Sequence, residues 1–384
     1  MKKIVLSLSF IIVAVVIFTS CKNDLNVFAP GKELVSVYGI INTNDLVQNI
    51  RINKVFLTTG DANSAATDNN VINYNAGELT VTLERYNTGS TVKLPTSQGS
   101  LKTEIVLTET VITTASGAFG NQQRMYQTTD KLYRTGEYKL VIRKTAELNT
   151  VIAYAQTVVV DSVSTSASGT MPFYYIPTNP TSYPNHGQYN TATPPFTTQS
   201  KYVNYSVPSV DQVIKIKSVL NAKIYDLVMR FHYVDSLIGG GTIDQTVDFN
   251  FNSQQATKLD GTEFITTFKF NTNDFYTNTA SEIAKKATPN VKNRKADYLE
   301  YIVSAGTENL YTFLQVNAPS ATIAQDKPFY SNITNGVGIF ASKSTSIVTK
   351  DLWADFLDKL ACHPSTFPYL FCDNLGKTRS VTCP

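Results

Sequence analysis

Short runs in which apolar and polar residues alternate recur along this sequence and restrict it to β structure. In the run 79–86, LTVTLERY, apolar Leu79, Val81 and Leu83 alternate with polar residues. A period of two is typical of a strand with one buried and one solvated face. Further strands are predicted for 34–41, 48–56, 103–109, 136–144, 150–160, 211–218, 222–236, 246–252, 264–270 and 297–305.

The first twenty residues have the pattern of an export leader. Lys2 and Lys3 precede the apolar run 4–18, and small side chains stand directly before Cys21. This order is typical of a secretory signal peptide. The apolar run is shorter than the about 20 residues that a membrane-spanning helix needs. We therefore predict that residues 1–20 are a leader, and the alternative is an uncleaved N-terminal anchor.

Residues 18–21, Phe-Thr-Ser-Cys, resemble the lipobox of bacterial lipoproteins, with Phe18 in place of the usual leucine. The resemblance implies that the leader is removed and that Cys21 carries acyl chains such as palmitate. Two or more acyl chains hold a protein firmly in a bilayer, whereas one chain binds it marginally. The alternative is a plainly secreted protein with a free Cys21 thiol. No cofactor is expected.

Charge and composition exclude one class of partner. Without the leader lysines, the 33 Lys and Arg residues fall to 31, against 30 Asp and Glu residues. This near-neutral balance argues against a nucleic-acid partner, which needs a basic surface. The 21 Tyr and 20 Phe residues, with only 16% charged residues, suit the pleated and half-buried faces of exported β proteins.

The chain divides at a segment rich in Pro, Ser, Thr and Tyr. We predict a tether over 21–33, an immunoglobulin-like β-sandwich over 34–161, a linker over 162–200, and a second β-rich domain over 201–384 with helices near the C-terminus. Proline removes ladder donors and favours extended backbone, which supports the linker. Four tyrosine rings of this linker form a predicted contact surface, and the alternative is that they cover apolar surface between the domains. They belong to Tyr174, Tyr175, Tyr183 and Tyr189.

Helical patterns gather in the last third of the chain. The run 307–318 has Thr307 as a predicted N-cap, and residues 281–286 are predicted to form one helical turn. The run 348–364 is the strongest pattern, with Thr349 as its N-cap and an apolar stripe that begins at Leu352.

Three cysteines remain near the end of the chain. An oxidising compartment predicts one disulfide and one leftover thiol among Cys362, Cys372 and Cys383. A Cys362–Cys372 bridge and a Cys372–Cys383 bridge both stay open.

Patterns for catalysis or metal binding are weak. The three histidines, His186, His232 and His363, are spread along the chain, and no HExxH or GxSxG motif occurs. We interpret His232 as a strand-face residue. The run 336–341, GVGIFA, fits the form GxGxxA, but its context predicts a turn and a strand rather than a nucleotide loop. We expect no catalytic residues and no metal site.

Three stretches together resemble a known family. They are CKNDLNVFAPGKELVSVYGIINTNDLVQNIRINKVFLTTGDA at 21–62, NAKIYDLVMRFHYVDS at 221–236, and NLYTFLQVNAP with FYSNITNGVGIFASKS at 309–344. The set resembles an uncharacterised lipoprotein family of the Bacteroidota, a domain of unknown function often encoded beside TonB-dependent transporters. The resemblance implies an outer-membrane location and establishes no catalytic residues.

These observations favour a non-enzymatic role. We expect a lipid-anchored protein of the outer membrane, on its cell-surface or periplasmic face, that binds or docks, with a TonB-dependent transporter as the partner that the resemblance implies. A surface adhesin or structural envelope protein is the alternative, and a glycan hydrolase stands third.

Overall fold

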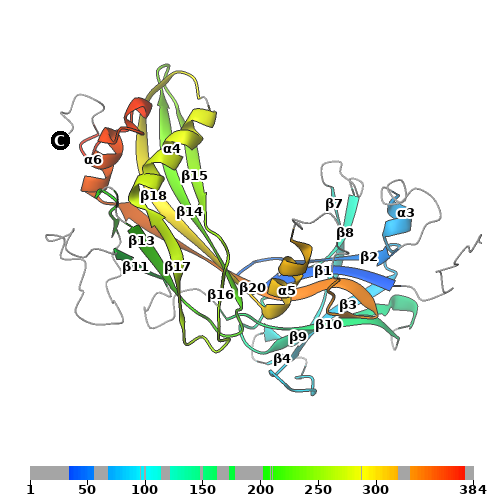
Figure 1. Cartoon of the computed structure of the whole chain (residues 1–384). Helices are drawn as coiled ribbons and strands as arrows, with labels where there is room; N and C mark the ends of the chain where they lie inside the picture. Colours follow the sequence, from blue (N-terminus) through cyan, green and yellow to red (C-terminus); the bar gives the residue numbers. More distant parts are fainter. Residues whose placement is uncertain are drawn as a thin grey trace, which may run out of the picture.

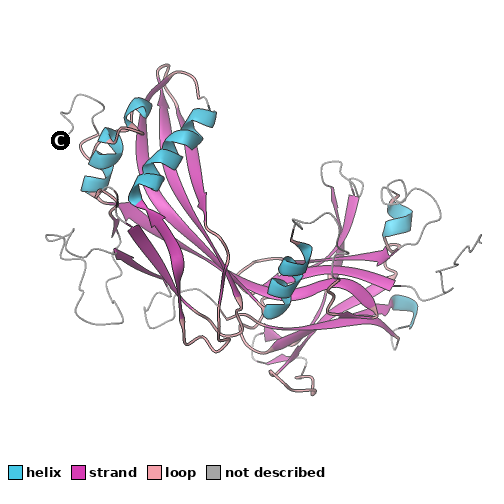
Figure 2. Cartoon of the chain, in the orientation of Figure 1, coloured by secondary structure: helices cyan, strands magenta, loops and turns pink. Residues whose placement is uncertain are grey.

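The described part of the chain is mainly β. The computed structural model describes residues 34–55, 68–95, 97–98, 101–113, 122–147, 150–161, 173–177, 202–207, 209, 211–286, 288–318 and 329–376, with only the backbone of 173–177. Its strands form several sheets, and the longer helices follow residue 271 (Figure 2). The prediction of a mainly β chain with helices near the C-terminus is confirmed.

A ten-stranded sheet runs through the whole fold (Figure 1). Its main order is β15 (Thr242–Asn250), β14 (Ile224–Leu237), β18 (Val291–Gly306), β20 (Gly336–Leu352), β1 (Leu34–Asn42), β2 (Gln48–Val55), β8 (Gln122–Thr128) and β7 (Thr108–Thr113). Two short strands join it at the side: β12 (Tyr202–Val203) on β20 and β16 (Gln254–Gln255) on β14.

Strand β20 pairs with β1 along its first half and with β18 along its second half. Its first half runs parallel to β1, from Gly336 beside Val35 to Lys343 beside Asn42. Its second half runs antiparallel to β18, from Lys343 beside Gly306 to Asp351 beside Tyr298. One strand therefore joins two lobes into a single sheet, which we call the shared sheet.

The first lobe, here called the two-sheet lobe, packs the β1 side of the shared sheet against a second sheet. That sheet has the order β19 (Ile333–Thr334), β10 (Val151–Val158), β9 (Glu137–Lys144), β3 (Leu79–Tyr86) and β6 (Glu104–Val106). The core between them is mostly aliphatic, with Val37, Ile52 and Leu83 among its fully buried residues. The alternation predicted for 79–86 is confirmed, because Leu79, Val81 and Leu83 all lie in this core.

Smaller elements decorate the two-sheet lobe. They are α3 (Asn69–Ile72), the hairpin of β4 (Ser97–Gln98) and β5 (Leu101–Lys102), and the 3-10 turn Thr145–Glu147. The predicted strand 103–109 is two strands: β6 pairs with β3 in the second sheet, and β7 pairs with β8 in the shared sheet. The chain changes sheets at the buried Leu107, which a single-strand pattern does not reveal.

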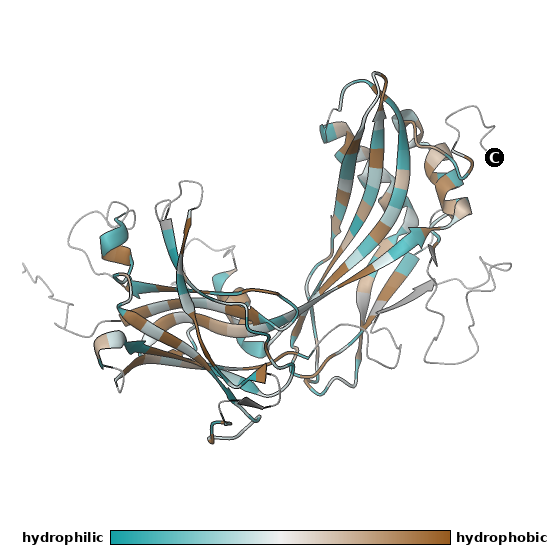
Figure 3. Ribbon diagram, turned by 180° about the vertical axis from the view of Figure 1, so that it is seen from behind, coloured by the Kyte–Doolittle hydropathy of each residue, from teal (hydrophilic) through white to brown (hydrophobic). Residues whose placement is uncertain are grey.

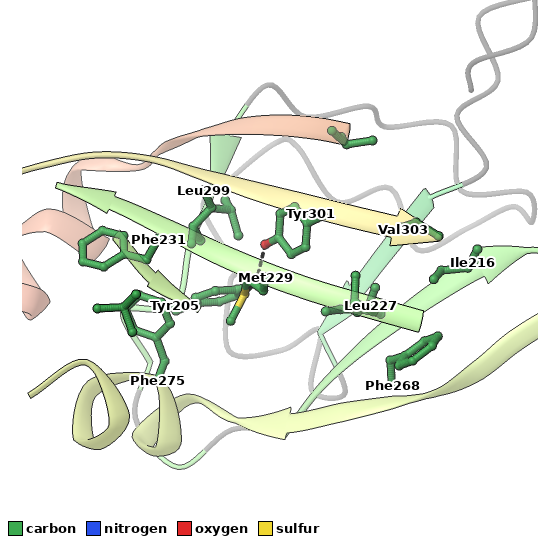
Figure 4. Close-up of a cluster of buried hydrophobic side chains, with 14 of the residues drawn as sticks. Tyr205, Ile216, Leu227, Met229, Phe231, Phe268, Phe275, Leu299, Tyr301 and Val303 are labelled. Atoms are coloured by element: carbon green, nitrogen blue, oxygen red, sulfur yellow. Dashed lines mark hydrogen bonds between the residues drawn. The ribbon is translucent and has the colours of Figure 1, made fainter. Parts of the chain in front are cut away.

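The second lobe, here called the helix-covered lobe, packs the β14 side of the shared sheet against helices. They are α4 (Thr272–Lys286) and α6 (Ala354–Cys362), beside a small sheet of β11 (Phe173–Pro177), β13 (Asp211–Lys217) and β17 (Phe264–Asn271). A 3-10 turn, Phe367–Tyr369, follows α6. The core is rich in rings, and Figure 4 shows Tyr205, Phe231, Phe275 and Tyr301 gathered around Met229.

Side chains of β20 alternate between the two faces of the shared sheet. Phe340 lies in the core of the two-sheet lobe, and Val348 and Leu352 lie in the core of the helix-covered lobe. We call this the inner face. Residues of the other parity lie on the outer face, where Ile339 packs under α5 (Glu308–Asn317) and Ile347 is 57% exposed. Figure 3 shows the same alternation of hydropathy along many strands.

The strongest predicted helix is partly wrong. Residues 348–352 continue β20, and α6 begins only at Ala354, with Trp353 rather than Thr349 as its N-cap. Thr349 lies in the strand beside Glu300. The reason is that residues four apart share a face in both a helix and a strand, so Leu352 and Phe356 fit either pattern. Residues 348–351 form a strand because they pair with β18.

Two other helix predictions have different outcomes. The predicted turn at 281–286 is the end of a longer helix, α4, which starts at Thr272. The helix predicted for 307–318 is confirmed as α5, and Thr307 stands at its N-cap without a side-chain cap bond.

The linear division at 162–200 needs a correction. Ile333 of β19 and Phe340 of β20 lie in the core of the two-sheet lobe, so the segment after α5 returns to the strands of residues 34–161. A parallel partner for β1 must come from a distant part of the chain. Among the described residues, no helix has the length and apolar character to cross a bilayer.

Candidate functional site

A hollow lies on the outer face of the shared sheet in the two-sheet lobe. Its volume is about 580 Å³, within the range of small-molecule sites of about 300–1,000 Å³. Strands β20, β1 and β2 provide most of its lining, and α3 adds one residue. The lining residues are Ser36, Tyr38, Arg51, Asn53, Lys54, Val55, Ile72 and Val337.

Strand register builds the floor of this hollow. Ser36 stands between Asn53 of β2 and Val337 of β20, and Tyr38 stands opposite Arg51. These side chains share the outer face because Val35, Val37, Ile50 and Ile52 fill the core on the other side. The sequence separates these two faces in the run 48–56, where Ile50 and Ile52 are predicted opposite Arg51 and Asn53.

Glycines permit the close approach of β20 to β1 at this floor. A Cβ atom on Gly338 would lie 2.0 Å from the carbonyl oxygen of Val37, and the φ angle of +109° also favours glycine. Gly336 has a similar contact, 2.4 Å from the carbonyl oxygen of Val35. The GVGIFA run is therefore a strand of the shared sheet, as its sequence context predicts.

Hydrogen bonds fix the polar side of the hollow. Arg51 donates from Nε to Asn53 Oδ1 at 2.7 Å. Asn53 in turn donates from Nδ2 to the carbonyl oxygen of Ile72 at 3.0 Å and to Asn73 Oδ1 at 2.9 Å. This network ties α3 to β2 and orients the guanidinium. Burial lowers the pKa of Arg51, which remains a cation at neutral pH.

The remaining walls combine the ring of Tyr38 with the aliphatic groups of Val55, Ile72 and Val337. Lys54 lies opposite the buried Val35, so its side chain leaves the sheet on the inner face, where Nζ lies 4.0 Å from Glu78 Oε2 and 5.1 Å from the ring centroid of Tyr74. Tyr38 is 54% exposed, and its ring centroid lies 6.4 Å from that of Phe313 on α5. The hollow thus presents positive charge, amide groups and apolar surface together.

A polar cluster lies on the outer face of the helix-covered lobe. Arg230 binds Asp248 through two bonds, Nε to Oδ1 at 2.7 Å and Nη2 to Oδ2 at 2.8 Å. This fork lowers the pKa of Asp248 and raises the pKa of Arg230. Figure 1 shows α4 and α6 beside this part of the sheet, and both helices pack on its inner face.

His232 connects this cluster to a ring. His232 Nε2 lies 3.0 Å from Glu300 Oε2, and its ring stacks on Tyr298 with centroids 4.2 Å apart. Burial and the neighbouring Glu300 raise the pKa of Tyr298. The strand position of His232 is confirmed, since it lies within β14. Within the described ranges, no group of three His, Cys, Asp or Glu side chains is placed to hold a metal ion.

The structure tests only some of the site residues that the sequence predicts. Tyr174 and Tyr175 lie in β11, whose backbone pairs with β13. Tyr183, Tyr189 and the lipidation residue Cys21 lie outside the described residues. The predicted contact surface and the anchor therefore stay predictions.

The cysteines near the C-terminus differ from the predicted pairings. Cys362 is disulfide-bonded, whereas Cys372 is a free and buried thiol. Both bridges that the sequence leaves open use Cys372, so the structure contradicts both, and Cys383 lies outside the described residues. The neighbouring Phe371 packs against the rings of Phe231 and Tyr233, and the amide of Cys372 donates to the carbonyl of Arg294, so this segment is held in the core.

Sequence reasoning missed most of the hollow. Ile72 and Val337 come from distant parts of the chain, and their contribution depends on the α3 contact and on the β1–β20 pairing. The sequence does indicate one part of the hollow, because the alternation in the run 48–56 places Arg51 and Asn53 on the face away from the core. A strand pattern identifies which face a side chain takes, but not which other strand adds to that face.

Comparisons with known proteins give little guidance. No protein-family model and no curated protein matches this chain. Among solved structures, the chain is similar to a chain of a "Cytokine receptor complex" at 11% sequence identity, covering 82% of this chain and 96% of that chain. The TM-score of that similarity is 0.18, so it carries no argument about function.

Proposed function

We propose that this chain is an outer-membrane lipoprotein, anchored through Cys21, whose folded part binds or docks to a partner without catalysing a reaction. The leader and the Phe-Thr-Ser-Cys tetrad support the anchor. The predicted tether over 21–33 leads directly into β1, so the whole fold follows the anchor. We also propose that the two-sheet lobe has immunoglobulin-like character.

One observation supports the docking role most strongly. Helices α4 and α6 cover the inner face of the helix-covered lobe, whereas its outer face presents side chains that are held by hydrogen bonds and ring stacking. Ile347 on β20 is 57% exposed on this face, and strands β15, β14 and β18 of the same face carry the Arg230–Asp248 fork and the His232–Tyr298 stack. Arginine and aromatic side chains contribute strongly to protein interfaces. Because Arg230 and Asp248 already neutralise each other, a partner need not supply a strong opposite charge at this point of the face.

The partner that we propose is a TonB-dependent transporter barrel in the same membrane. This choice rests on the family resemblance and on the proposed anchor, which holds the chain beside such barrels. A protein tethered to the same bilayer meets its partner at a raised effective concentration, so a modest interface suffices for docking.

Site-specific crosslinking in living cells tests this proposal. A photo-crosslinking amino acid is placed at Ile347 on the outer face and, as a matched control, at Lys285 on α4, whose side chain is 66% exposed. After irradiation, the products are purified and identified by mass spectrometry. We expect a transporter barrel to crosslink from position 347 and not from position 285.

The opposite result has a clear meaning. If acylated protein in the outer membrane gives no barrel product from position 347, the transporter proposal is wrong, and the adhesin or structural alternative becomes the leading one. The anchor is tested separately with Cys21→Ala. We expect this variant to lose labelled palmitate and to leave the membrane fraction, and an unchanged membrane fraction would contradict the lipid anchor.

A further inference from the structure

We propose that the hollow beside Tyr38 binds an anionic amphiphile, with a carboxylate or phosphate head at Arg51 and an apolar tail along Val55, Ile72 and Val337. This site is separate from the docking face of the helix-covered lobe, and only the membrane source of its ligand rests on the proposed Cys21 anchor.

The cationic side of the hollow suits an anionic head. The Arg51 guanidinium is partly buried and its plane is fixed by the bond from Nε to Asn53 Oδ1. A planar guanidinium recognises carboxylate and phosphate groups through parallel N–H donors. Lys54 does not add to this charge, because it lies opposite the buried Val35 and its ammonium group lies on the inner face, 4.0 Å from Glu78 Oε2.

The rest of the lining suits an apolar tail. Val55, Ile72 and Val337 face the hollow from β2, α3 and β20, and the ring of Tyr38 borders it. Burial of apolar area contributes about 25 cal/mol per Å², so a chain laid along these side chains adds affinity that a bare ion lacks. A ligand with only one of the two parts leaves half of this lining unused.

The location of the hollow agrees with a membrane-derived ligand. Leu34 opposes Val55, so the hollow lies at the end of the sheet where the chain enters from residues 21–33. These 13 residues span at most about 45 Å, which keeps this end of the lobe within reach of the bilayer if Cys21 is the anchor. The same chemistry also occurs in free fatty acids and alkyl phosphates.

Calorimetric titration of the mature full-length chain carrying Cys21→Ala tests the proposal. Four probes are compared below their micellar concentrations: dodecanoate, dodecyl phosphate, dodecanol and inorganic phosphate. We expect the first two to bind at least about tenfold more tightly than the last two, because a hydrogen-bonded charge contributes about 1.5–3 kcal/mol. Equal binding of dodecanol, equal binding of inorganic phosphate, or no binding of dodecanoate would overturn the proposal.

Variants locate the site. Arg51→Gln is expected to weaken dodecanoate binding about tenfold. Lys54→Gln should bind normally, because the Lys54 side chain leaves the sheet on the inner face. Arg230→Gln, an arginine on the outer face of the other lobe, is the matched control and should bind normally. If Arg51→Gln does not fold, the four-probe comparison decides. A folded Arg51→Gln variant with unchanged affinity would place the binding elsewhere and contradict the site.

Vesicles distinguish the two sources of the ligand. The same soluble chain is sedimented with phosphatidylglycerol vesicles and with phosphatidylcholine vesicles. Arg51-dependent sedimentation with the anionic vesicles alone supports a membrane lipid as the ligand. Dodecanoate binding without sedimentation supports a free amphiphile.

Discussion

In the two-sheet lobe the inner face of the shared sheet meets a second sheet, and in the helix-covered lobe the same face meets two helices and a small sheet. The first core is mainly Val, Ile and Leu, whereas the second gathers rings such as Phe231, Phe275, Tyr276 and Phe356. Two sheets pack about 10 Å apart, which aliphatic side chains fill. In the second core the large rings pack edge to face, as Phe231 and Phe275 do with centroids 5.4 Å apart.

The lobes also differ in where their core residues come from. The helix-covered lobe uses residues 203–371 together with Val160. The two-sheet lobe uses residues 35–159 and then needs Ile333 and Phe340 from the far end of the chain. The comparison indicates that one lobe is nearly self-contained in sequence, while the other is completed only when β20 arrives.

Truncation gives the largest expected effect. A chain that ends at Asp161 keeps most strands of the two-sheet lobe but lacks β19 and β20, so the β1 edge stays unpaired. We expect this fragment to show no cooperative unfolding transition by circular dichroism, whereas residues 201–384 retain one. A cooperative transition in the first fragment would contradict the dependence on β20.

Gly338→Ala is expected to be the most damaging single change in the two-sheet lobe. The new Cβ would meet the Val37 carbonyl at 2.0 Å, at a φ angle that L residues avoid. We expect a loss of more than about 4 kcal/mol in the free energy of unfolding, measured with urea. Gly77→Ala is the control, since Gly77 has φ +70° with open space around it and should lose about 1 kcal/mol. Equal losses would show that the clash is relieved.

Asp235→Ala tests the helix-covered lobe in the same way. Asp235 is fully buried and lies 2.8 Å from Arg294 Nε, while Arg294 Nη1 donates to the carbonyl of Tyr369 at 2.8 Å. Removal of the carboxylate leaves a buried cation, which costs about 3–5 kcal/mol. Urea unfolding of the variant measures this loss, and a loss below about 1 kcal/mol would contradict the buried pair.

Acid should weaken the helix-covered lobe through His363. This ring stacks on Tyr276 with centroids 4.3 Å apart, and its Nδ1 accepts a bond from the amide of Ser365. Burial, with a smaller contribution from Lys359, lowers the pKa of His363. The unfolded chain therefore binds a proton first, so stability falls as pH drops through about 6.5. We expect His363→Gln to show a smaller loss than wild type between pH 7.5 and 5, and equal losses would contradict this.

The smallest expected effect is at the exposed fork. Arg230 lowers the pKa of Asp248, so this carboxylate contributes stability above its ordinary pKa and loses it as pH falls through the lowered value. Both side chains are about a third exposed, and such pairs contribute about 0.2–1 kcal/mol. We expect Asp248→Asn to lose no more than this at pH 7 in urea unfolding, with the difference from wild type vanishing in strong acid.

Much of the secondary structure follows from local pattern. Leu79, Val81 and Leu83, or Tyr138, Leu140 and Ile142, reach the core as their alternation predicts. The outward position of Arg51 and Asn53 follows from the same rule. The hollow that these residues line does not, because Val337 and Ile72 join it only through contacts between distant segments.

The sequence alone determined the mainly β class, the position of α5 and the faces of single strands, because a side chain's direction depends on its immediate backbone. It also supplies the leader and tetrad behind the anchor proposal. The tertiary structure decided the β1–β20 pairing, the extension of β20 through Val348 to Leu352, and the exclusion of Cys372 from a bridge. Each of these depends on partners hundreds or tens of residues away, and only the folded chain brings them together.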